Sequence, residues 1–134
     1  MAPDRAVGVA VLVVEADRAE RERFGTWLER SGFEVLMCPG PTEPDYTCVG
    51  AREGICPLAA EVDAVVLDMS LDSEAVMVGT SAEEILGFYL MSGRRVVALG
   101  SRSGDDVPGQ LVRLRRHPSP NHLVEALRSF FDAA

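Results

Sequence analysis

The stretch Val7-Gly-Val-Ala-Val-Leu-Val-Val14, followed by Glu15-Ala16-Asp17, decides the fold. It is a continuous apolar run rich in β-branched residues, and it ends abruptly at an acidic residue. Such a run is typical of a strand that is buried on both faces of a parallel sheet. A strand of this kind needs helices above and below it, so the run predicts an α/β protein.

Strand and helix patterns alternate along the rest of the chain. Asp17 and Glu20 form a capping-box pattern that opens a helix over about 18–31. Ser81 and Glu84 repeat that pattern before a helix to about 92, and Ser119-Pro120 suits the start of a last helix. Further strands are predicted at 33–38, 64–68, 95–99 and 111–115. The alternation predicts a doubly wound α/β sheet, whose ligands lie at the carboxyl ends of the strands.

Two connections are too irregular for full helices. The segment 39–57 contains four prolines, three glycines and two cysteines, so we expect a Cys/Pro/Gly-rich loop in place of the second helix. The segment between Gly100 and Pro118 is short and contains Gly104, Pro108 and Gly109, so the fourth helix is expected to shrink to a turn. At 134 residues, the chain is expected to form a single domain over 1–134.

Composition restricts the partners that the chain could bind. The formal net charge is -8, so nucleic acid and anionic membrane surfaces are repelled on average. The longest apolar run, 7–14, is too short to span a bilayer, and the N-terminus lacks the pattern of a secretory signal. We therefore expect a cytoplasmic protein without nucleic-acid or membrane partners.

The chain resembles the receiver domains of response regulators, of the chemotaxis-regulator type. The resemblance is carried by Val-Leu-Val-Val-Glu-Ala-Asp at 11–17, by Glu-Arg-Ser-Gly-Phe-Glu-Val at 29–35, by Asp68 at the end of the third strand, and by His117-Pro118 before the last helix. It implies a flavodoxin-like, five-stranded parallel sheet in the order 2-1-3-4-5. It also implies Mg²⁺, held by acidic residues after the first strand beside a phosphorylatable aspartate, because this hard cation prefers oxygen ligands.

The residues that carry phosphorylation in the family are altered here. The resemblance places the phosphoacceptor at Asp68 and the first acid at Glu15, but the second acid falls on Ala16, which cannot hold a metal. Asp17 is adjacent, although it is expected to cap the first helix. Mg²⁺ binding should therefore be weakened.

The switch hydroxyl and the basic residue of the family are altered as well. The switch residue falls on Gly100, with Ser101 one place later, and the lysine falls on His117, beside Arg116. Imidazole is a weaker and pH-dependent phosphate partner. Two interpretations of Asp68 stay open, a phosphoacceptor and a carboxylate that only supports the next loop.

The predicted function is a stand-alone, atypical receiver-like module that acts by protein–protein interaction, with Asp phosphorylation impaired or absent. Its partner would be another signalling protein or a second copy, docked through the fourth and fifth strands and the last helix. The chain lacks the phosphate-binding and nucleophile motifs of common enzymes, so no enzymatic activity is expected. The run 113–116 is either an anion-binding patch or the charged face of an edge strand, and His122 should face solvent.

The cysteines suggest an alternative function on the same scaffold. Cys38, Cys48 and Cys56 could bind a metal ion or an Fe-S cluster, or a Cys48–Cys56 disulfide could form, which would make the chain a metal or redox sensor. Their spacing matches no standard zinc motif, and three ordinary buried thiols are the favoured interpretation. The sequence leaves these three possibilities open.

Overall fold

The computed structural model describes residues 9–15, 17–38, 62–69, 82–100 and 106–131. Their elements are β1 (Ala10–Val14), α1 (Arg18–Arg30), β2 (Glu34–Cys38), β3 (Ala64–Asp68), α4 (Ala82–Met91), β4 (Arg95–Leu99), β5 (Leu111–Leu114) and α5 (Pro120–Ser129). Each lies within a residue or two of the range predicted from the sequence, except that β1 begins at residue 10, later than the apolar run from which it was predicted.

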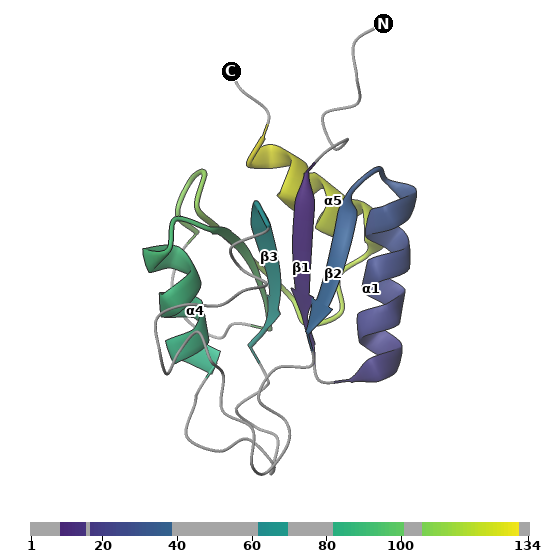
Figure 1. Ribbon diagram of the computed structural model, residues 1–134, viewed down its shortest axis with the longest axis horizontal. Coiled ribbons are helices and arrows are strands. Elements are labelled where there is room, and N and C mark those ends of the chain that lie inside the picture. The colour runs from purple at the N-terminus through teal and green to yellow at the C-terminus, as the bar shows by residue number, and fades with distance from the viewer. Residues whose placement is uncertain (1–8, 16, 39–61, 70–81, 101–105, 132–134) are drawn as a thin grey trace, which may run out of the picture.

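The five strands form one parallel sheet in the order β2-β1-β3-β4-β5, as predicted. The β-branched residues of the three central strands are almost fully buried, because helices cover both faces of the sheet. Figure 1 shows α1 and α5 on one side of the sheet and α4 on the other.

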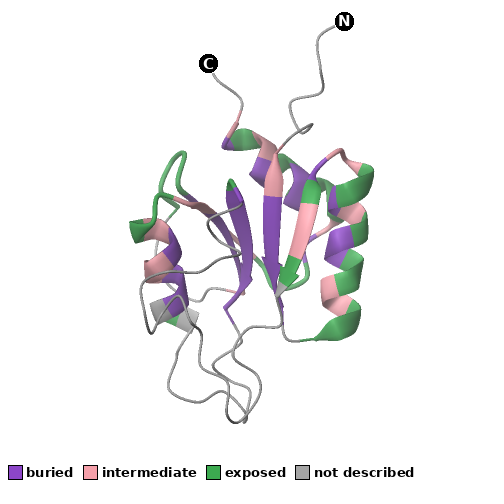
Figure 2. Ribbon diagram, in the orientation of Figure 1, coloured by how far each residue is buried: buried purple, intermediate pink, exposed green. Residues whose placement is uncertain are grey.

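The alternation of side chains along each strand divides the core into two layers. Val11 and Val13 pack with Phe24 and Leu28 of α1 and with the inner residues of α5. Leu12 and Val14 face the opposite way and pack with residues of α4, namely Ile85, Leu86 and Tyr89. Figure 2 shows the buried residues of each helix turned toward the sheet.

The connection before β5 ends in a tight turn. Val107 and Leu111 exchange backbone hydrogen bonds of 2.8 Å in both directions, and Gly109 adopts a positive φ of 76° within the turn. The described part of this connection, 106–110, therefore contains a turn. It lies between β4 and β5, where the sequence predicts that a helix is reduced to a turn. The predicted reduction of the second helix concerns 39–57, which lies outside the described residues. No helix in the described part of the chain is long and apolar enough to cross a membrane.

Candidate functional site

The carboxyl ends of β1 and β3 bring two acidic residues together. Val14 is the register partner of Leu67, so Glu15 and Asp68, the next residue on each strand, lie at the same level of the sheet. Both are almost fully buried, with exposed fractions of 3% and 2%, and no other acidic residue whose burial is described is buried. Buried carboxylates destabilise a protein unless hydrogen bonds or opposite charges compensate them.

The two carboxyl groups compensate each other by sharing a proton in a hydrogen bond. Burial, the hydrogen bond with Asp68 and the negative charge of Asp68, in that order, raise the pKa of Glu15 from an ordinary value of 4.5 to about 8. Glu15 therefore retains its proton at neutral pH and donates a hydrogen bond to Asp68. Two carboxylates this close cannot both ionise at low cost.

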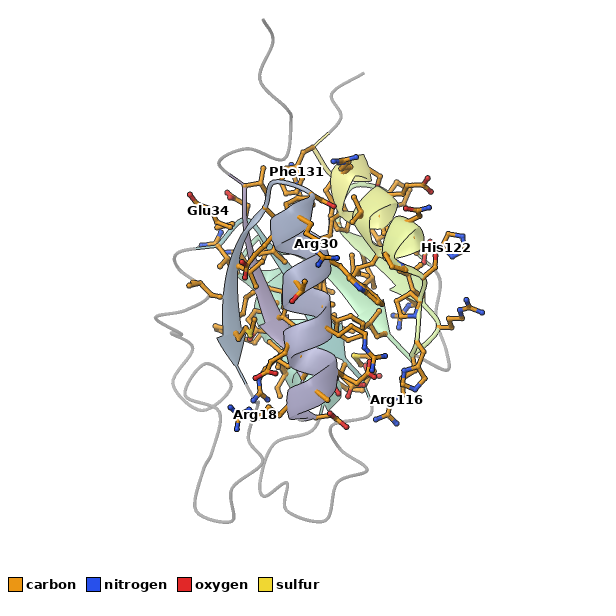
Figure 3. The ribbon with its side chains drawn as sticks, turned by 90° about the vertical axis from the view of Figure 1, so that its right-hand side faces the viewer. Arg18, Arg30, Glu34, Arg116, His122 and Phe131 are labelled. Carbon is orange, nitrogen blue, oxygen red and sulfur yellow. The ribbon has the colours of Figure 1, made fainter. Side chains whose placement is uncertain are left out.

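Arg116 supplies the positive charge of the site. Its Nη2 atom lies 4.0 Å from Oδ2 of Asp68, and its side chain is 44% exposed, so the guanidinium closes the site from the solvent side. Together with the backbone hydrogen bond from Asp17, this charge lowers the pKa of Glu15. Figure 3 shows Arg116 at the same end of the molecule as Arg18, the first residue of α1.

Gly100 makes room for Arg116. Gly100 follows β4, has a φ of +77°, and donates a backbone hydrogen bond of 2.9 Å to the carbonyl of Leu114. A Cβ atom at Gly100 would lie 3.4 Å from Cβ of Arg116. A residue with a side chain would therefore be strained by its own backbone and would crowd the guanidinium stem.

The connection from β1 to α1 is held by three hydrogen bonds. The Asp17 N–H donates to Oε1 of Glu15 over 3.3 Å, and Nη1 of Arg21 donates to the carbonyl of Glu15 over 2.7 Å. The Asp17 side chain accepts from the N–H of Glu20 over 3.1 Å, which confirms its predicted role as the cap of α1. The carboxylate of Asp17 is thus engaged by the helix, away from the Glu15–Asp68 pair.

His117 contacts α1 and not the carboxyl pair. Its Nδ1 atom lies 3.7 Å from Oε2 of Glu20, which also pairs with Nη1 of Arg23 at 2.9 Å. Arg116 and His117, although consecutive, therefore reach two different acidic residues on two different elements. His122 is exposed, as predicted, and projects from α5 in Figure 3.

Comparison with known proteins supports the same architecture. No family model matches the chain, and no curated protein matches it in sequence. Solved structures do match. A response regulator receiver protein from Sinorhizobium medicae WSM419 has a TM-score of 0.66 at 14% identity and covers 93% of this chain and 95% of its own.

Two further receiver structures agree. A response regulator receiver domain protein from Bacillus halodurans C-125 has a TM-score of 0.66 at 15% identity, over 93% of this chain and 98% of its own. A CheY-like receiver domain protein from Methanospirillum hungatei JF-1 has a TM-score of 0.61 at 16% identity, over 92% and 94%.

The chain has the receiver fold. The sheet order, the layers and the position of Glu15 and Asp68 at the strand ends all follow this fold, which confirms the fold predicted from the sequence. At these levels of identity, the likeness concerns the fold alone.

Two features of the described residues bear on Mg²⁺ binding. A metal-binding carboxylate must be deprotonated, whereas Glu15 keeps its proton at neutral pH when no cation is bound, and Oδ1 of Asp17 caps α1. The described residues contain no group of three His, Cys, Asp or Glu side chains that could hold a metal ion. Ala16, which the sequence places where the family has its second acid, lies outside the described residues.

The remaining predicted site residues are only partly described. Ser101, Cys48 and Cys56 lie outside the described residues. Cys38 ends β2, but its side chain is not described. The structure therefore leaves their predicted roles as predictions.

The sequence did not indicate the contacts that Arg116, Glu20 and Arg21 make around the site. Arg116 was noted as the neighbour of His117 and as part of the run 113–116, Glu20 as part of the capping-box pattern, and Arg21 only as a residue of the predicted helix. The sequence carried only a weak signal for these contacts. A basic residue soon after a buried strand suggests a cation near the strand ends, but the path of the backbone between β5 and α5 decides where its side chain points.

Proposed function

We propose that this chain is an atypical receiver-like module that acts by protein–protein interaction, and that its Asp68 is phosphorylated poorly or not at all. The observation that carries the proposal is the buried pair in which protonated Glu15 donates a hydrogen bond to Asp68. A nucleophilic carboxylate must be free to attack, and here Asp68 is hydrogen-bonded to a neighbouring acid and lies 4.0 Å from the guanidinium of an arginine.

The charge balance of the site supports this proposal. Phosphoryl transfer to a carboxylate needs cations that neutralise the phosphoryl oxygens. With Glu15 protonated, the negative charge of Asp68 is already balanced by Arg116. Addition of a phosphoryl group would bring more negative charge next to Glu15. If the site binds Mg²⁺ poorly, Arg116 is the cation that the described residues offer to balance this charge.

The outer edge of β5 limits how a partner can dock there. Val107 already pairs with Leu111 through two backbone hydrogen bonds, and Oδ1 of Asp106 accepts from the N–H of Arg113 over 2.8 Å. These groups are therefore not available to an added strand. A partner at this edge would bind side chains, among which Arg115 is exposed.

The test is intact-mass spectrometry after incubation with acetyl phosphate and Mg²⁺. We expect no stoichiometric phosphoryl increment on the wild type. Ala16→Asp restores the missing acid and is the positive arm, while Asp68→Asn removes the acceptor and is the control. An increment on the wild type that is absent from Asp68→Asn would overturn the proposal.

Weak Mg²⁺ binding is part of the same proposal. Calorimetric titration with Mg²⁺ should give little or no heat with the wild type and a stronger response with Ala16→Asp. Tight binding by the wild type would contradict the proposed role of the Glu15 proton. The alternative of a metal or redox sensor rests on Cys38, Cys48 and Cys56, and no described contact favours it.

A further inference from the structure

The outer face of α4 differs from the outer faces of α1 and α5. The exposed positions of α1 include Arg18, Glu22 and Arg30, and those of α5 include His122 and Glu125. Such charged faces are typical of helices that stay in water.

In α4, by contrast, only the first turn is charged. From Ile85 to Gly93 the sequence has no charged residue, and Met91 is 92% exposed. Phe88 and Leu90 are half-buried on the two flanks of the helix. This helix is apolar on the side that faces away from the sheet.

Gly87 and Met91 form the centre of this outer face. They are four residues apart, so they lie one above the other on the helix surface, opposite the buried Ile85, Leu86 and Tyr89. A Cβ atom at Gly87 would meet nothing within 4 Å. The face therefore has open space at Gly87 and an exposed, flexible side chain at Met91.

We propose that α4 docks against α4 of a second copy of this chain, with the two helices antiparallel about a two-fold axis. Centring the axis between Gly87 and Met91 places Met91 of each copy in the open space at Gly87 of the other. Glycine at a helix contact lets the two backbones approach closely, and methionine adapts to an irregular gap. A contact of this type is isologous, as in most homodimers.

The charges at the two ends of the helix favour a second copy as the occupant. Glu83 is exposed in the first turn, and Arg94 lies just beyond the last turn. In the antiparallel arrangement, Glu83 of one copy approaches Arg94 of the second copy at both ends of the contact. The same face is therefore complementary to itself in shape and in charge.

The size of the face predicts a weak and reversible dimer. A helix of ten residues is about 15 Å long, and its flank buries less than the roughly 800 Å² per partner of a standard interface. We expect a dissociation constant of about 10 µM to 1 mM. The dimer does not depend on Asp68, so the inference goes beyond the proposed function and can fail independently of it.

The experiment is sedimentation velocity on the full chain over about 5 µM to 1 mM at about 0.15 M salt. Gly87→Leu fills the open space, and Met91→Lys replaces the exposed side chain with a charge. Each should raise the dissociation constant by about tenfold or more. Thr26→Leu, a similar change on the exposed face of α1, is the matched control and should leave it unchanged.

A charge exchange tests the antiparallel arrangement. Glu83→Arg should weaken the dimer, and the double variant Glu83→Arg with Arg94→Glu should recover most of the affinity. Asp68→Asn should dimerise as the wild type does. Urea unfolding should show Gly87→Leu to be no less stable than the wild type, because the new side chain meets no described atom at its base and glycine is a poor helix former.

Two results would overturn the proposal. One is a wild-type chain that stays monomeric up to about 1 mM, which would leave the face of α4 for a different protein. The other is a dimer that neither Gly87→Leu nor Met91→Lys weakens, which would place the dimer contact on another surface.

Discussion

The raised pKa of Glu15 makes the stability of the protein depend on pH. The pKa of this carboxyl is about 8 in the folded chain and 4.5 in the unfolded chain. Below pH 4.5 both states are protonated and folding carries no penalty from this group. As the pH rises toward 8, the unfolded state releases the proton while the folded state keeps it, so stability falls. Above pH 8 the loss is complete.

The size of the loss follows from the difference between the two pKa values. Each unit of difference corresponds to about 1.4 kcal/mol, so the shift from 4.5 to about 8 corresponds to at most about 5 kcal/mol. Glu15 is coupled to the neighbouring charges in the folded chain, so the measured loss should lie below this bound. A loss of this order is a large share of the free energy of unfolding of an ordinary domain.

The assay compares the wild type with Glu15→Gln by urea unfolding at pH values from 5 to 9. Glutamine donates a hydrogen bond to Asp68 as the protonated acid does, but it cannot ionise. The wild type should become less stable than Glu15→Gln as the pH rises, whereas Glu29→Gln, a change of an exposed acid on α1, should follow the wild type. Parallel stability profiles of the wild type and Glu15→Gln would refute the shared proton.

Three further substitutions test the geometry of the site. Arg116→Gln should raise the pKa of Glu15 further, because the lost positive charge had lowered it, and the shift is measurable by carboxyl ¹³C NMR titration. Gly100→Ala should cost about 1–2 kcal/mol in urea unfolding, because alanine is strained at a positive φ and its Cβ crowds Arg116. Asp17→Ala should cost about 1 kcal/mol and reduce the helical signal in circular dichroism, because the N–H of Glu20 loses its cap. Wild-type stability in either of the last two variants would contradict the strain or the cap described here.

Much of the fold could be predicted because the central strands have a clear apolar, β-branched sequence pattern. A run such as Val11–Val14 or Ala64–Leu67 is apolar on both faces, which is typical of a strand in a covered parallel sheet. The capping pattern at Asp17 located the start of α1 correctly. The first residue of β1 was predicted less accurately, because an apolar run does not show at which residue pairing with a neighbouring strand begins.

The site was predictable only to the level of the strand ends. Since parallel strands end at one edge of the sheet, Glu15 and Asp68 could be expected to meet. Their shared proton could not, because it depends on the depth of burial and on the side-chain conformations of both residues. Nor does the sequence show which of the consecutive Arg116 and His117 turns toward Asp68, since that choice depends on the path of the backbone between β5 and α5.

The arrangement of these residues also explains why a proton can take the place that the resemblance assigns to a cation. A metal ion at this edge would balance two carboxylates at once, but only if both are ionised. When Glu15 is protonated, one negative charge remains, and a single guanidinium is enough to balance it. Any variant that restores metal binding must therefore do more than supply a ligand, because it must also draw the proton from Glu15. Ala16→Asp should for that reason bind Mg²⁺ more tightly as the pH rises from 6 to 8, in parallel with the ionisation of Glu15.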